Sequence, residues 1–129
     1  MKYLRNLIYL FSFVYSPLIY LLIKLLVLIK TIRITPIMTN RYGHLAANPE
    51  YYLLKNKNYK KNNKYLDVFF TSKLGICNSV LLNLWKKKIL IIPYYWIEST
   101  YKIFIKLETK KTLHTIPNFT YNLRFFNYN

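Results

Sequence analysis

The feature that most constrains this chain is an uncharged run of 17 residues, Leu7 to Ile23, near the N-terminus. Lys24 interrupts the run, and five more apolar residues follow. A helix needs about 20 mostly apolar residues to cross a bilayer, so the run lies at the lower limit for a span. Pro17 would kink such a helix, and Lys24 could reach the interface along its apolar stem. The run therefore fits a short membrane span or a kinked helix that lies in the interface.

Two other interpretations compete with membrane association. Lys2 and Arg5 precede the run, as in a cleaved secretory signal, but the run is too long and no small-x-small cleavage site follows. A core helix buried on all faces would need more surrounding protein than 129 residues can supply. We therefore expect residues 1–31 to form a membrane-associated helix that contacts lipid. More basic residues follow the run than precede it, which predicts that the remainder faces the cytoplasm at the inner membrane.

Composition excludes several classes of protein. The chain is 53% hydrophobic and carries a net charge of +16. The apolar content argues against disorder, and the charge would attract phosphate or anionic lipid. Charge alone favours nucleic acid as a partner, because the chain lacks an arginine-rich helix, a ribonucleoprotein motif and zinc-finger spacing, so no nucleic-acid partner is expected. The single cysteine, Cys77, excludes a disulfide framework, and we expect it to be buried. Four acidic residues and an isolated His114 offer no metal site, so no metal or cofactor is expected.

After residue 31, short apolar segments alternate with helical patterns. Strands are expected at Ile32–Met38, Leu66–Thr71 and Lys88–Pro93, and a final helix at Trp96–Lys106. Such alternation predicts an α/β fold with a parallel sheet, here a partial Rossmann-like half-domain over residues 32–108. An irregular tail is expected at 109–129, and a solvated loop at Lys55–Lys64.

The two intervening helices have recognisable start signals. Asn48 is a suitable N-cap, and Pro49 fits the first position of a helix. Asn78 or Ser79 would begin the next helix, and the lysines at 86–88 would end it in solvent. On that helix the helical spacing predicts a core face made of Val80, Leu81, Leu84 and Trp85.

The candidate site is the first strand-to-helix loop, Thr39 to Asn48, because ligands bind at the carboxyl ends of parallel strands. Arg41 could bind the phosphate of an acceptor or lipid, or be a solvated cation. Gly43 permits a positive φ or the close approach of a ligand. His44 could bind the acceptor or act as general base, or it could cap the helix. Asn48 could bind substrate instead of capping the helix.

Three blocks of this sequence resemble the N-terminal half of a bacterial family of glycosyltransferases. They are RYGHLAANPEYYL, LDVFF and ICNSVLLNLWKKKILIIP, and they cover Arg41 to Pro93, about 40% of the chain. The family's signature is similar to Arg-Ile-Gly-His-Leu-Ala, a Leu-Asp strand, and then Cys-Asn-x-x-Leu-Leu-x-x-Trp-Lys-Arg before an apolar strand. In this chain Tyr42 replaces the small aliphatic residue of the first block.

The resemblance implies a GT-B-like enzyme with two Rossmann-like halves and no catalytic metal. The N-terminal half would bind a surface-polysaccharide or lipid-linked acceptor, and the C-terminal half a nucleotide sugar. His44 would be the catalytic residue, and Arg41, Gly43 and Asn48 would bind substrate. The sequence ends near HTIPNFTYN, where the donor half would begin, so we expect the chain alone to be inactive. The alternative is a small, basic, membrane-anchored protein that binds anionic lipid or a protein partner and catalyses nothing.

Overall fold

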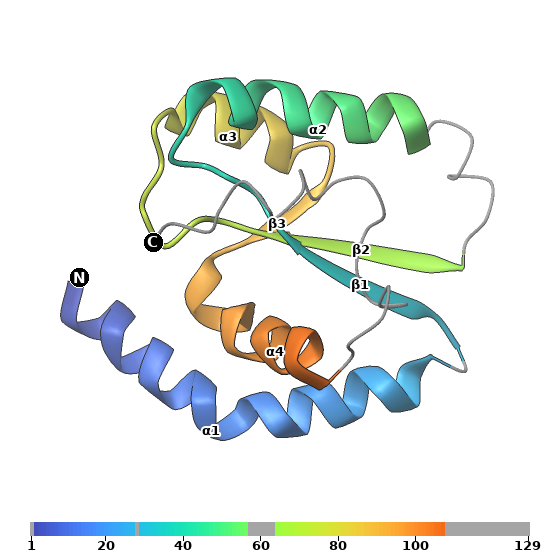
Figure 1. The fold of residues 1–129 in the computed structure, drawn as a ribbon. Helices are drawn as coiled ribbons and strands as arrows, with labels where there is room; N and C mark the ends of the chain where they lie inside the picture. The colour runs from blue at the N-terminus through green and yellow to red at the C-terminus, as the bar shows by residue number, and fades with distance from the viewer. Residues whose placement is uncertain (1, 28, 57–63, 108–129) are drawn as a thin grey trace.

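The computed structural model describes residues 2–27, 29–56 and 64–107 (Figure 1). The elements follow the order α1 (Lys2–Leu26), β1 (Thr31–Pro36), α2 (Tyr42–Asn56), β2 (Tyr65–Phe70), α3 (Ser79–Lys86), β3 (Leu90–Ile92) and α4 (Tyr94–Leu107). The expected alternation of strands and helices after an apolar N-terminal helix is confirmed. The expected tail at 109–129, with His114, lies outside the described residues, as does most of the expected loop at Lys55–Lys64.

The sheet has three parallel strands in the order β1-β2-β3. β1 pairs with β2 from Thr31↔Tyr65 to Pro36↔Phe70, and β2 pairs with β3 from Val68↔Leu90 to Phe70↔Ile92. Parallel neighbours require a crossover segment, which α2 and α3 provide. All three strands therefore end at the same edge of the sheet, which we call the carboxyl edge.

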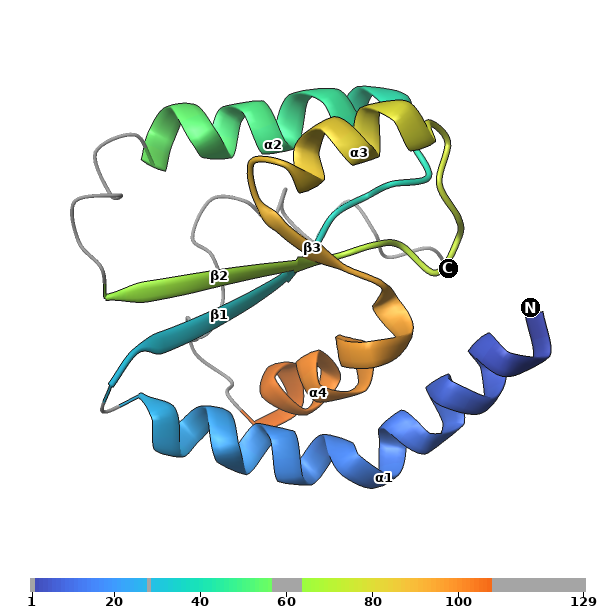
Figure 2. The ribbon, with the colours of Figure 1, turned by 180° about the vertical axis from the view of Figure 1, so that it is seen from behind.

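The helices cover both faces of the sheet. α2 and α3 lie on one face, whereas α4 lies on the other, with α1 beyond it (Figure 1, Figure 2). Each face has its own hydrophobic core, because neighbouring strand residues point to opposite sides. Phe69 belongs to the core under α2 and α3, with Ile37, Leu45, Leu82, Ile89 and Ile91. Phe70 belongs to the core under α4 and α1, with Ile23, Ile34, Tyr94, Tyr101 and Phe104.

One stripe of α1 packs against α4 and the sheet, and the opposite face is exposed. Ser12, Ser16 and Ile23 are buried, and the ring of Tyr20 lies 4.7 Å from that of Phe104 of α4. By length and composition, Tyr3–Leu26 could cross a membrane, a criterion that core helices and signal sequences also meet. The apolar helix is thus confirmed, and it is neither buried on all faces nor detached from the domain.

The start of α2 differs from the expectation. The helix begins at Tyr42, and the amide of Leu45 donates to the carbonyl oxygen of Arg41 at 2.9 Å. Asn48 and Pro49 therefore lie inside the helix, so the predicted Asn48 cap is wrong. Leu45 is fully buried against the sheet. The apolar burial of Leu45 stabilises a helix that begins before residue 48. This gain offsets the loss of the backbone hydrogen bond that Pro49 cannot donate.

The start of α3 agrees with the expectation, and its buried face agrees in part, because Leu81 and Trp85 pack against the core as predicted. The side chain of Asn78 caps the helix by accepting from the amide of Leu81 at 2.9 Å. Val80 and Leu84 are exposed, whereas Leu82 is buried. Cys77 is exposed as well, contrary to the expectation. The packing of α3 on the sheet turns Leu82 toward the core together with Leu81 and Trp85, an orientation that the spacing of apolar residues in the sequence does not define.

Candidate functional site

The loops that follow β1 and β2 meet at the carboxyl edge through Thr39. Its hydroxyl donates to the carbonyl oxygen of Gly75 at 2.6 Å and accepts from the amide of Ser72 at 3.0 Å. Its carbonyl oxygen accepts from the amide of Cys77 at 2.8 Å. Thr39 is fully buried, so these bonds hold the two loops in one arrangement. Thr39 falls within the predicted loop, but its partners lie more than 30 residues away, and no sequence pattern singled it out.

The structure places three of the four predicted site residues on α2, and Arg41 in the loop directly before it. Arg41 is exposed directly before the helix, and Gly43 and His44 lie in its first turn. Asn48 lies one turn further and is only 9% exposed. Since residues three and four apart share a helix face, Arg41, His44 and Asn48 follow one line along α2. Arg41 and His44 are therefore brought together at the carboxyl edge, and Asn48 lies behind them.

The first turn of α2 can attract an anion. It contains no acidic residue, and the amides at a helix N-terminus carry partial positive charge. Arg41 adds a full charge next to that turn. In the described residues, Oδ1 of Asn40, in the loop before the helix, is buried and has no hydrogen-bond partner. This oxygen accepts hydrogen bonds, so this part of the edge combines positive charge for an anion with an acceptor for a hydroxyl or amine donor.

The two glycines of the chain have different roles. Gly75 has φ +112°, the left-handed region that side chains rarely adopt, whereas Gly43 is helical. The expected positive φ thus occurs at Gly75 and not at Gly43. A Cβ at Gly43 would meet nothing within 4 Å, which leaves open space over the first turn of α2.

We therefore expect opposite effects from two alanine substitutions. Gly75→Ala should lower the free energy of unfolding by about 1 kcal/mol or more, because alanine is strained at a positive φ. Gly43→Ala should raise it by about 0.5–1 kcal/mol, because alanine favours a helix and the site has room. Denaturant unfolding followed by circular dichroism measures both. A loss of stability in Gly43→Ala would contradict the helical role of that glycine.

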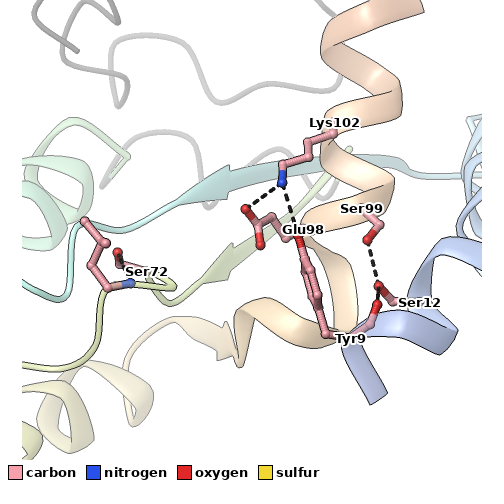
Figure 3. A network of polar contacts seen from close by, with 7 residues as sticks. Tyr9, Ser12, Ser72, Glu98, Ser99 and Lys102 are labelled. Carbon is pink, nitrogen blue, oxygen red and sulfur yellow. Dashed lines mark hydrogen bonds and ion pairs between the residues drawn. The ribbon is translucent and has the colours of Figure 1, made fainter. Parts of the chain in front are cut away.

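The other side of the loop after β2 contacts α1 and α4. Tyr9 of α1 accepts a hydrogen bond from Nζ of Lys102 at 3.2 Å, and Lys102 pairs with Glu98 at 3.0 Å (Figure 3). Nζ of Lys73, in the loop after β2, lies 5.0 Å from the centroid of the Tyr9 ring. Partial burial lowers the pKa of Lys102, but the hydrogen bonds to Tyr9 and Glu98 outweigh this effect and raise its pKa overall. We call Tyr9, Lys73, Glu98 and Lys102 the Tyr9 cluster.

No sequence pattern predicts the Tyr9 cluster, because its members lie on α1, on α4 and in the loop after β2. Tyr9 also packs against Tyr94, the residue that begins α4 directly after β3, with ring centroids 5.8 Å apart. The N-terminal half of α1 thus contacts residues that follow both β2 and β3. The apolar helix and the carboxyl edge are neighbours in the structure.

A second polar group lies in the middle of the strands, away from the carboxyl edge. Arg33 of β1 pairs with Asp67 of β2 through two hydrogen bonds of 2.6 Å, and both side chains are largely buried. The hydroxyl of Tyr52 donates to the same carboxylate, and the Tyr65 ring lies 4.3 Å from Cζ of Arg33. Burial, followed by the hydrogen bond to Asp67, raises the pKa of Tyr52 well above its usual value. Since every partner is engaged, this group is structural.

The described residues contain no group of three or more His, Cys, Asp or Glu side chains that could hold a metal ion. A scan against protein-family models found no match, and searches of curated proteins and of solved structures found no significant match either.

Proposed function

We propose that the chain is the membrane-associated, acceptor-binding part of a GT-B-type glycosyltransferase. Its reaction would transfer a sugar from a nucleotide sugar to a lipid-linked or surface-polysaccharide acceptor on the cytoplasmic face of the inner membrane. The observation that carries the proposal is the contact of Tyr9 with Lys73, which brings the apolar helix next to the carboxyl edge. An enzyme that modifies a lipid-linked acceptor needs its acceptor groove beside the membrane.

The strand order supports a Rossmann-like half. α2 and α3 cover one face, and the chain then changes to the other face, where α4 contacts β1 and β2 (Figure 2). In a Rossmann-like sheet a helix in this position returns the chain to the free edge of the first strand. The crevice where ligands bind would then open at the end of β1, next to Arg41 and His44.

In the proposed reaction, His44 accepts the proton of the acceptor hydroxyl. The hydroxyl oxygen forms a bond with the anomeric carbon, and the bond from that carbon to the phosphate oxygen breaks. The nucleoside diphosphate leaves with the electron pair. Arg41 and the N-terminus of α2 would hold the phosphate of a lipid-linked acceptor, in the space that Gly43 leaves open. Asn48 is nearly buried, so a substrate would reach it only where its side chain lies next to His44.

The exposed apolar residues of the loop after β2 fit an apolar part of the acceptor. Leu74 is 80% exposed and Ile76 is 51% exposed, in the same loop as Lys73. An isoprenoid chain carrying a phosphate would meet apolar side chains and cations together at this point. The described residues hold no second α/β half for the nucleotide sugar, so transfer would need a further half.

The test is sugar transfer by membranes that contain the chain, alone and together with products of neighbouring reading frames. A panel of labelled nucleotide sugars is the donor, and label in the organic phase is the readout. We expect transfer only in a combination with a donor half, and a fall of about 100-fold or more in His44→Ala, the usual contribution of a general base. Glu50→Gln, an exposed change on the same helix, is the matched control and should keep full activity.

Three outcomes would contradict parts of this proposal. Transfer by the chain alone that His44→Ala abolishes would show that no second half is needed. Full activity of His44→Ala in an active combination would remove His44 from the mechanism. Absence of transfer in every combination would favour the alternative, a non-enzymatic protein that binds anionic lipid or a protein partner. The large excess of lysine and arginine, 20 against 4 acidic residues, is the observation that supports this alternative.

A further inference from the structure

We propose that α1 lies in the plane of the membrane interface while it remains packed on α4, and does not cross the bilayer. This inference rests on the membrane association proposed above and adds the orientation of the helix.

The inward face of α1 packs against the rest of the domain. Tyr9, Ser12, Ser16, Ile19, Tyr20 and Ile23 form a stripe at helical spacing that is buried or packs against the core under α4. This stripe extends over about 21 Å of a helix that is about 37 Å long, at 1.5 Å per residue. Oγ of Ser12 lies 2.6 Å from Oγ of Ser99 on α4, and the hydroxyl of Ser16 donates to the carbonyl oxygen of Ser12. The hydroxyls of Ser12 and Ser16 also bond to carbonyl oxygens within α1, so of these contacts only the one between Ser12 and Ser99 requires α1 to be docked on α4.

A spanning helix would bring the domain into the hydrocarbon. α4 would follow α1 into the bilayer, together with Glu98 and Lys102, and a charged side chain near the centre of a bilayer costs about 2.5–3.5 kcal/mol or more. The open edge of a sheet cannot lie in hydrocarbon at all, because its backbone groups would have no partners. If α1 instead undocked, it would uncover the core that contains Phe70 and Phe104 and break the contact between Ser12 and Ser99. An in-plane helix avoids both costs.

The outward face fits a lipid surface. It is made of large apolar side chains that are 50–78% exposed, namely Leu7, Leu10, Phe11, Phe13, Val14, Leu18, Leu21, Leu22 and Leu25. Arg5 and Lys24 belong to the same helix, Lys30 follows it, and no acidic residue occurs before Glu50. Each such cation near an anionic membrane contributes about 1 kcal/mol of attraction. A second copy of this chain would bring like charges together at the same face, so the charge pattern favours anionic lipid.

The shape of α1 agrees with this orientation. Pro17 is exposed and lies inside the helix, which bends with its concave side toward α4 (Figure 2). Proline removes one backbone hydrogen bond and permits such a bend. The convex, apolar side is the one left for the membrane. Because Tyr9 contacts Lys73, this orientation also holds the carboxyl edge near the lipid headgroups.

The first experiment joins α1 to α4 by a disulfide. In a Cys77→Ser background, Ser12→Cys and Ser99→Cys should form a disulfide, since the two hydroxyl oxygens are 2.6 Å apart. The oxidised and reduced proteins are mixed with vesicles of phosphatidylcholine and phosphatidylglycerol. An in-plane helix predicts that oxidation changes the Kd by about twofold at most, because the docked state is the binding state. A spanning or undocked helix predicts that oxidation raises the Kd about tenfold or more, because the disulfide prevents the undocked conformation that would bind the vesicles. That result would overturn the inference and leave membrane association intact.

The second experiment measures depth. Single cysteines at Leu7, Val14, Leu21 and Leu25 carry a nitroxide, and Leu54→Cys on α2 is the control, with the exposed Leu54 on the far side of the sheet. In-plane binding predicts a shallow insertion depth of about 5–10 Å for all four labels. The control label on α2 should not insert into the bilayer. A label at Val14 near the bilayer centre, about 15 Å deep, with shallow labels at both ends would show a span and overturn the inference. Failure of every form to bind vesicles, or a dimer in their place, would overturn membrane association as well.

Discussion

Replacement of Asp67 by alanine is expected to lower the free energy of unfolding by about 3–5 kcal/mol, because it would break a buried ion pair. The side chain of Arg33 is 7% exposed, and its guanidinium pairs with Asp67 through two hydrogen bonds. Alanine would leave this charge buried without a partner, and the hydroxyl of Tyr52 would lose its acceptor. Unfolding by guanidinium chloride in mild detergent, followed by circular dichroism, measures the loss.

The double variant Arg33→Met, Asp67→Leu is the control for this prediction. It removes both charges and keeps apolar volume between β1 and β2, so we expect it to recover most of the lost stability. Tyr52→Phe removes a single hydrogen bond to the carboxylate and should cost about 1–2 kcal/mol. If the double variant were as unstable as Asp67→Ala, the loss would come from packing and not from the uncompensated charge.

Replacement of Phe104 by alanine should cost about 3–5 kcal/mol, the usual range for a buried phenylalanine. Phe104 is 1% exposed and lies in the core between α4, α1 and the sheet. Its ring is 4.7 Å from that of Tyr20, so the cavity would open at the contact between α4 and α1. We therefore expect limited proteolysis to cut α1 sooner in this variant than in the wild type.

Ile105→Ala is the matched control for Phe104→Ala. Ile105 is the next residue of α4 and is 43% exposed, so its truncation should cost about 0.5 kcal/mol or less. Protease sensitivity of α1 should also stay at the wild-type level. Equal losses in the two variants would show that the packing of α4 on α1 does not depend on Phe104.

The sequence by itself determined the class of fold. The β-branched and aromatic runs predicted three strands, and the helical patterns between them predicted parallel pairing, because parallel neighbours need a crossover. The cap at Asn78 was also predictable, since it depends on contacts within one turn. For the candidate site, the sequence located the loop after β1, with Arg41 and His44 at the carboxyl edge.

Only the tertiary structure decided where α2 begins and which side chains are buried. Asn48 and Pro49 are a good local start signal, but the burial of Leu45 extends the helix past them. Tertiary packing overrides a weak local preference whenever it buries enough apolar surface. The exposure of Cys77 and Val80 has the same origin, because the orientation of α3 depends on the sheet and not on its own spacing.

The tertiary structure also decided how α1 is used and which residues join the site. The sequence of α1 is apolar on nearly every side, and only docking on α4 separates a buried stripe with Ser12 and Ser16 from an exposed apolar face. Thr39 with Gly75, Arg33 with Asp67 and Tyr9 with Lys102 are contacts between residues 34–93 positions apart. Local patterns describe at most one or two turns of chain, so such pairs are defined only when the elements that carry them pack together.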